Sequence, residues 1–227
     1  MYVPPFIPQQ IEIPGNVAQE SYSVRLGFVR RTVRYHFVTV IGILAISYFP
    51  LNLSIRDAVI LSVASLIALS LVRGLVKGKH YEQLLSGLFA PMLFYGLGQL
   101  VAAGSERGWP QWAVVVGPAA AWVYTMLCGR DLSFVGMWVM SALAKTIVIC
   151  SLAFSDVFSW FIAGETLLIG YGYLAFFVYD LACLLTRRRL GEEGGAVLDL
   201  YRDLLNCITY PIRIVQHWRK HRIWSLK

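Results

Sequence analysis

Residues 157–186 read VFSWFIAGETLLIGYGYLAFFVYDLACLLT, a long apolar run in which Glu165 and Asp180 are the only charged residues. A helix needs roughly 20 mostly apolar residues to cross the hydrocarbon core of a bilayer, so this run is long enough to span one. Six further runs lie at about 33–53, 57–76, 83–103, 110–128, 133–154 and, more polar than the others, 196–216. The pattern predicts an all-α, polytopic membrane protein with seven transmembrane helices.

The composition excludes a soluble globular enzyme. Of the 227 residues, 57% are hydrophobic and only 15% are charged, whereas soluble domains carry about 25% charged residues. The chain lacks the G-x-S-x-G, H-E-x-x-H and P-loop motifs. Its four histidines have no spacing that would gather them around a metal. We therefore expect neither an enzymatic activity nor a bound cofactor.

The basic residues indicate membrane topology rather than nucleic-acid binding, although the net charge is +7. Eleven Lys and Arg lie before or at the start of the first run, at the end of the second run, or in the loops after the second, fourth and sixth runs, against two in the alternate loops. Basic residues are enriched on the cytoplasmic side, so the count predicts a cytoplasmic amino terminus. The compact loops favour a bacterial plasma membrane, and an endoplasmic reticulum membrane also fits.

The runs divide the chain into one domain and two tails. Residues 1–22 contain four prolines and are expected to form an irregular cytoplasmic tail. Residues 23–216 form a single seven-helix membrane domain, and residues 217–227 form a basic tail whose side of the membrane stays open.

Charged residues inside the runs are the candidate functional residues, because each costs about 2.5–3.5 kcal/mol at the centre of a membrane helix. In the last run a polar stripe, spaced by four, three and four residues, comprises Asp199, Asp203, Asn206 and Tyr210. This spacing places the stripe on one face of a helix, which must then lie inside the bundle or line water. The stripe is either a hydrogen-bonded seam between helices or an ion path, and its two carboxylates favour the ion path.

Three other charged positions leave alternatives open. The apolar residues on both sides of Asp180 favour burial, while pairing with Arg187 or Arg188 near the interface is the alternative. Lys145 and Glu165 either neutralise each other or serve a function. Arg73 is expected to extend towards the cytoplasmic surface rather than inward to a carboxylate.

Four passages resemble the transmembrane Bax-inhibitor-motif (Bax-inhibitor-like) family: VRLGFVRR at 24–31, RDLSFVG at 130–136, VYD at 178–180 and LDLYRDLLN at 198–206. The resemblance implies a polar central last helix wrapped by six others, a pH-sensitive calcium leak and a role in stress protection. It implies that Asp180 and Asp203 act as the pH sensor and that Arg73 takes part in gating. Asp199 matches an acidic position of some relatives, and Lys145 departs from the family pattern.

The chemistry of two close carboxylates supports a hypothesis for the mechanism. In a low-dielectric bundle, Asp180 and Asp203 would share one proton and titrate as a coupled pair. When both are ionised, repulsion favours separation and their oxygens form a transient site for Ca²⁺. Asp199, Asn206, Arg73 and Glu165 are further candidates for the ion path or its gate. The expected partners are calcium ions, the lipid bilayer and other membrane proteins, and not nucleic acid.

A second function fits the same residues. The protein would then be a non-conducting interaction protein that regulates a membrane protease or a cell-death or stress response. In that case the polar stripe is a hydrogen-bonded seam between helices, and replacing Asp203 has no effect on ion flux.

Overall fold

The computed structural model describes residues 12–49, 53–76, 79–155 and 158–205, and these residues are helical with no strand. The elements, in chain order, are η1 (Val17–Gln19), α1 (Tyr22–Ser47), α2 (Ile55–Leu75), α3 (Lys79–Glu106), α4 (Ala113–Leu127), α5 (Phe134–Ala153), α6 (Trp160–Arg187) and α7 (Glu193–Arg202).

Serine caps fix where three of the long helices begin. The side chains of Ser54, Ser133 and Ser159 each accept a hydrogen bond from the backbone N–H three residues later. Such a bond satisfies one of the N–H groups that the first turn of a helix leaves unpaired. The caps therefore end the loops before α2, α5 and α6.

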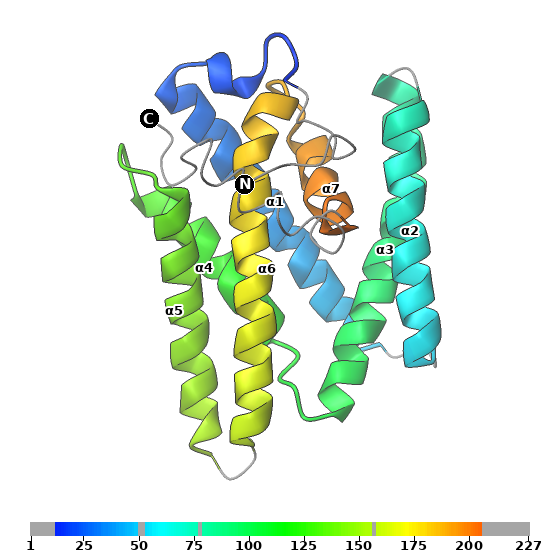
Figure 1. The fold of residues 1–227 in the computed structure, drawn as a ribbon, viewed down its shortest axis with the longest axis vertical. Helices are drawn as coiled ribbons and strands as arrows, with labels where there is room; N and C mark the ends of the chain where they lie inside the picture. The colour runs from blue at the N-terminus through cyan, green and yellow to red at the C-terminus, as the bar shows by residue number, and fades with distance from the viewer. Residues whose placement is uncertain (1–11, 50–52, 77–78, 156–157, 206–227) are drawn as a thin grey trace, which may run out of the picture.

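The helices run alternately up and down the long axis of the molecule (Figure 1). α2 packs on α3, α4 and α5 pack on each other, and α1 contacts α3, α4 and α7. The start of α1, the end of α2, the start of α3, the α4–α5 loop and the α6–α7 loop all lie at the upper end in Figure 1. This is the end to which the sequence count assigns eleven basic residues.

Two glycines allow α3 to approach its neighbours closely. A Cβ at Gly96 would lie 2.5 Å from Ser62 Oγ and 3.1 Å from the Ser62 backbone nitrogen, on α2. A Cβ at Gly98 would lie 2.5 Å from Ile46 Cγ2 and 3.1 Å from the Ile43 carbonyl oxygen, on α1. Small residues at such contacts are typical of helix packing in membranes.

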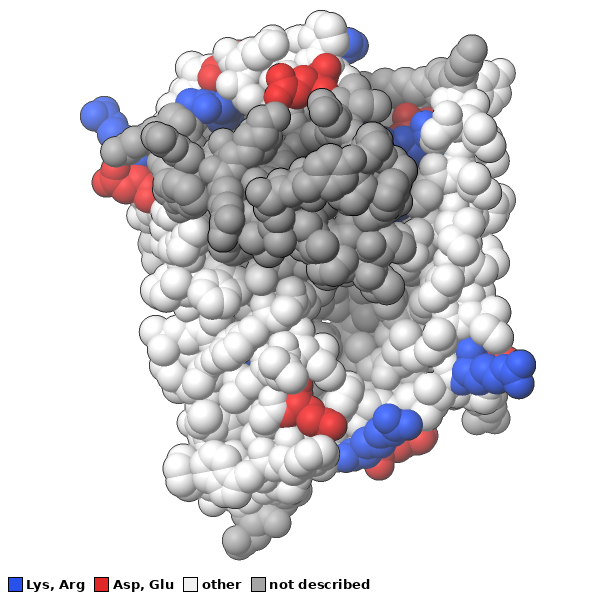
Figure 2. Space-filling view, in the orientation of Figure 1, with Lys and Arg blue, Asp and Glu red and all other residues white. Residues whose placement is uncertain are grey.

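Four helices, α2, α3, α5 and α6, are long and apolar enough to cross a membrane, and α4 is a shorter apolar helix. Their outward faces carry large apolar side chains, such as Leu71, Leu88 and Leu168, which are 54%, 61% and 74% exposed. On the visible described surface, charged residues gather mainly towards the two ends, and the flanks between them are uncharged (Figure 2). These features are consistent with an integral membrane protein.

The first and last helices differ from the long apolar helices. α1 begins at Tyr22, well before the apolar run at 33, and its first half carries four arginines. α7 is described for ten residues only, and the rest of the run expected to end at 216 lies outside the described residues. Within the described part, α7 contacts α1, α2, α3 and α6.

Candidate functional site: two carboxylate–guanidinium clusters

The candidate site forms where α6 ends and α7 begins. Gly191, with φ of 79°, lies in the short loop between these helices, in the left-handed region that glycine adopts most readily. The loop turns the chain back, so that α7 packs against α6 and α2. On α7, Asp199 and Asp203 lie one turn apart, and the Asp203 backbone N–H donates to the Asp199 carbonyl oxygen at 2.9 Å.

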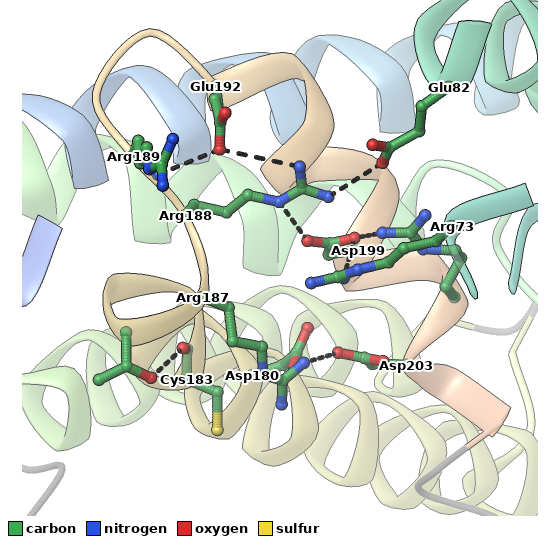
Figure 3. A network of polar contacts seen from close by, with 12 residues as sticks. Arg73, Glu82, Asp180, Cys183, Arg187, Arg188, Arg189, Glu192, Asp199 and Asp203 are labelled. Atoms are coloured by element: carbon green, nitrogen blue, oxygen red, sulfur yellow. Dashed lines mark hydrogen bonds and ion pairs between the residues drawn. The ribbon is translucent and has the colours of Figure 1, made fainter. Parts of the chain in front are cut away.

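The first cluster, which we name the aspartate pair, comprises Asp180, Asp203 and the guanidinium of Arg187. Asp180 is fully buried on α6. Arg187, two turns later, places Nη1 3.6 Å from Asp180 Oδ1 and donates a hydrogen bond from the same nitrogen to Asp203 Oδ2. One cation therefore contacts two carboxylates, as Figure 3 shows.

The second cluster, the Asp199 cluster, has the opposite balance. The carboxylate of Asp199 is fully buried and forms ion pairs with three arginines. Two of its partners, Arg73 Nη1 and Arg188 Nε, each lie 2.5 Å from the carboxylate (Figure 3). The third partner is Arg202 Nη2. Arg202 also donates to the Leu69 carbonyl oxygen on α2, at 3.4 Å.

Two glutamates complete the Asp199 cluster on its outer side. Arg188 Nη2 lies 3.7 Å from Glu82 Oε1, and Arg188 Nη1 lies 3.9 Å from Glu192 Oε2. A polar cavity of about 560 Å³ lies beside these groups and is lined in part by Glu82, Glu192, Arg188 and Arg202. Burial lowers the pKa of the Arg188 guanidinium, and the two glutamates oppose this shift.

The structure brings the two predicted sensor residues together. Asp180 and Asp203 meet at Arg187, and Asp180 is both buried and paired, which joins the two readings that the sequence left as alternatives. For Arg73 the structure shows the inward alternative, because its side chain pairs with Asp199 while remaining 31% exposed. The physical reason is that the buried carboxylate of Asp199 needs a counter-charge, and Arg73 at the end of α2 is within reach.

Three other predicted residues do not join the clusters. Glu165 lies on α6 about 22 Å before Asp180 along the helix axis and accepts a hydrogen bond from Trp109 Nε1 at 3.2 Å. Lys145 forms no ion pair with Glu165. The side chain of Lys145 instead packs against Gly170 of α6. Asn206, with Tyr210 of the same stripe, lies outside the described residues.

Sequence reasoning did not identify Arg202 and Glu82 as site residues. Arg202 follows Asp199 by three residues, a spacing that places two helical side chains on one face, and this signal was available in the sequence. Glu82 lies on α3, more than 100 residues before Arg188, and no local pattern links the two.

The chemistry of the two clusters is limited to carboxylates and guanidinium groups. In the part of the chain that the structure describes, no group of three or more His, Cys, Asp or Glu side chains is placed to hold a metal ion. Carboxylate oxygens are ligands that Ca²⁺ accepts, and the aspartate pair offers two such groups.

Comparisons with known proteins identified no relative of this chain. No protein-family model, no curated protein and no solved structure matches the chain.

Proposed function

We propose that this chain is a Bax-inhibitor-like, seven-span protein of a bacterial plasma membrane with a cytoplasmic amino terminus, and that it conducts a slow calcium leak with a role in stress protection. The meeting of Asp180 and Asp203 at one guanidinium, in a buried position between α6 and α7, is the observation that carries this proposal. The alternation of the helices, with the basic loops at one end, supports the topology.

The net charge of the aspartate pair and Arg187 gives the direction of the proposed pH response. With one shared proton, the aspartate pair and Arg187 are formally neutral, which suits a buried site. When that proton leaves, the site carries a net charge of about −1, from two carboxylates and one guanidinium. This state attracts a cation and favours separation of α6 from α7, so we expect the calcium flux to rise with pH.

The test is calcium flux into proteoliposomes at about pH 6 and pH 8, which bracket a pair that titrates near neutrality. Wild-type flux is expected to be larger at the higher pH. Asp203→Asn removes one titrating group and is expected to abolish the pH dependence. Asp131→Asn, an exposed aspartate in the α4–α5 loop, is the matched control and should behave as the wild type.

An unchanged pH dependence in Asp203→Asn would contradict the proposed sensor. If folded protein gives no calcium flux at both pH values, the proposal that the protein conducts calcium would be contradicted.

One observation favours the second function, a non-conducting protein that regulates a membrane protease or a cell-death or stress response. Three arginines surround Asp199 beside the aspartate pair, and a concentration of positive charge opposes the passage of calcium. This reading predicts that Asp203→Asn has no ion phenotype and that the purified protein captures a membrane partner.

A further inference from the structure

A second, apolar cavity lies away from both clusters. Its volume is about 350 Å³, within the range of small-molecule sites in proteins. Residues of α1, α3, α4, α5, α6 and α7 line it, and most of the lining is aliphatic or aromatic. Ile169, which is 54% exposed on α6, is one of the residues that line the cavity.

Lys145 is the positively charged residue in the lining of this cavity. Its side chain comes from the middle of α5, is only 6% exposed and lines the cavity together with Gly170. Gly170 on α6 makes room for it, because a Cβ at this position would overlap Lys145 Nζ. Lys145 has no hydrogen-bond or ion-pair partner among the described residues.

The other polar side chains of the lining use their donors within the protein. Trp109 donates to Glu165 at 3.2 Å, Gln111 donates to Ser105 at 2.9 Å and Thr166 donates to the Ile162 carbonyl at 2.8 Å. The hydroxyl of Tyr173 pairs with His36 Nε2 at 2.5 Å, and that of Tyr201 pairs with Thr39 at 2.7 Å. Among these lining side chains, Lys145 is the one without a hydrogen-bond or ion-pair partner in the described part of the chain.

No acidic side chain among the described residues forms an ion pair with Lys145. Glu165, the nearest acidic residue along α6, is held by Trp109 rather than by Lys145. Residues 206–227, which follow the α7 residues that line the cavity, contain no aspartate or glutamate. A buried ammonium without an anion is costly, so the site is suited to an anion from outside the protein.

We propose that this cavity binds an apolar monocarboxylate, such as a free fatty acid, whose carboxylate pairs with Lys145 Nζ and whose hydrocarbon chain fills the cavity. The aliphatic lining matches the hydrocarbon chain, and the single ammonium matches a single negative charge. This inference is independent of calcium conduction, because neither cluster contributes the ammonium or the apolar lining.

The experiment measures binding of the fluorescent fatty acid cis-parinaric acid to the full chain in neutral-lipid nanodiscs, with empty nanodiscs as the baseline. The wild type is expected to bind it saturably, and to bind the uncharged methyl ester at least about tenfold more weakly, since a hydrogen bond to a charged group is lost. Lys145→Met, which keeps the apolar length without the charge, is expected to weaken binding of the acid by a similar factor and to leave the ester unaffected. Arg107→Met removes an exposed cation and should leave both affinities unchanged.

The proposal would be overturned by equal binding of acid and ester by the wild type, or by equal binding of the acid by the wild type and Lys145→Met. The comparison of acid with ester needs no variant, so it remains decisive if Lys145→Met fails to fold. Equal loss in Lys145→Met and Arg107→Met would show attraction of the acid to surface charge and would also overturn the site.

Discussion

The two clusters on α7 are one helical turn apart and use the same two chemical groups in opposite proportions. In the aspartate pair, one guanidinium contacts two carboxylates. In the Asp199 cluster, three guanidinium groups contact one carboxylate, and two glutamates stand further out. The aspartate pair has more carboxylates than guanidinium groups. In the Asp199 cluster, guanidinium groups outnumber the carboxylate at the centre.

This difference suggests different roles for the two clusters. We propose that the aspartate pair titrates and that the Asp199 cluster holds helices together. Two poorly solvated carboxylates with one cation reach neutrality by keeping a proton, and this is the basis of the proposed pH response of the aspartate pair. Asp199 has three arginines around it, and the guanidinium group of arginine stays charged in proteins. Through them the Asp199 cluster ties α7 to the end of α2 and to the residue that follows α6.

The largest effect is expected from Asp199→Asn. The substitution leaves three arginines without their central anion, and loss of one partner of a buried ion pair costs about 3–5 kcal/mol. We expect the thermal unfolding temperature of the purified protein to fall by roughly 10 °C. Asp131→Asn, at an exposed position, is the control and should unfold with the wild type. An unfolding temperature within experimental error of the wild type would mean that the Asp199 cluster does not tie the helices.

A smaller effect, and one that depends on pH, is expected from Arg187→Met. Without the guanidinium of Arg187, ionisation of both carboxylates places two negative charges close together in a poorly solvated site, so stability should decrease as pH rises. The loss is expected to reach about 3 kcal/mol at pH 8 and to be smaller at pH 6. Thermal unfolding measured across this pH range checks the slope, with the exposed neighbour Arg189→Met as the control.

A double variant sharpens this prediction. Adding Asp180→Asn to Arg187→Met removes one of the two anions and should recover much of the stability at pH 8, because the two groups are coupled. No recovery would show that Arg187 stabilises the fold through contacts other than the aspartate pair.

The smallest effect is expected from Glu82→Gln, at the outer edge of the Asp199 cluster. Its carboxylate lies 3.7 Å from Arg188, and the side chain is 27% exposed. Partly exposed ion pairs contribute about 0–1 kcal/mol, so the unfolding temperature should change little. A loss as large as that of Asp199→Asn would mean that the outer glutamates, and not Asp199, neutralise the arginines.

Hydrophobic pattern and helical period were sufficient for part of this architecture. The run at 157–186 predicted α6 to within a few residues, because a long apolar segment leaves the chain no other way to satisfy its backbone in lipid. The four-residue spacing of Asp199 and Asp203 predicted that both lie on one face of α7, and they do. The run at 33–53 was less accurate, since α1 starts at Tyr22 with an arginine-rich first half that hydropathy does not mark.

Apolar composition and periodicity are local properties, so the sequence alone predicts long apolar helices that contain aspartates. Which arginine meets which aspartate depends on how the helices pack. Arg187 is the last residue of α6 and contacts Asp180 and Asp203, whereas Arg188 has an extended backbone, with φ of −128° and ψ of 152°, and contacts Asp199. Adjacent residues of one type thus join different clusters because the helix ends between them, and the partners reach them from α2, α3 and α7, which sequence spacing does not reveal.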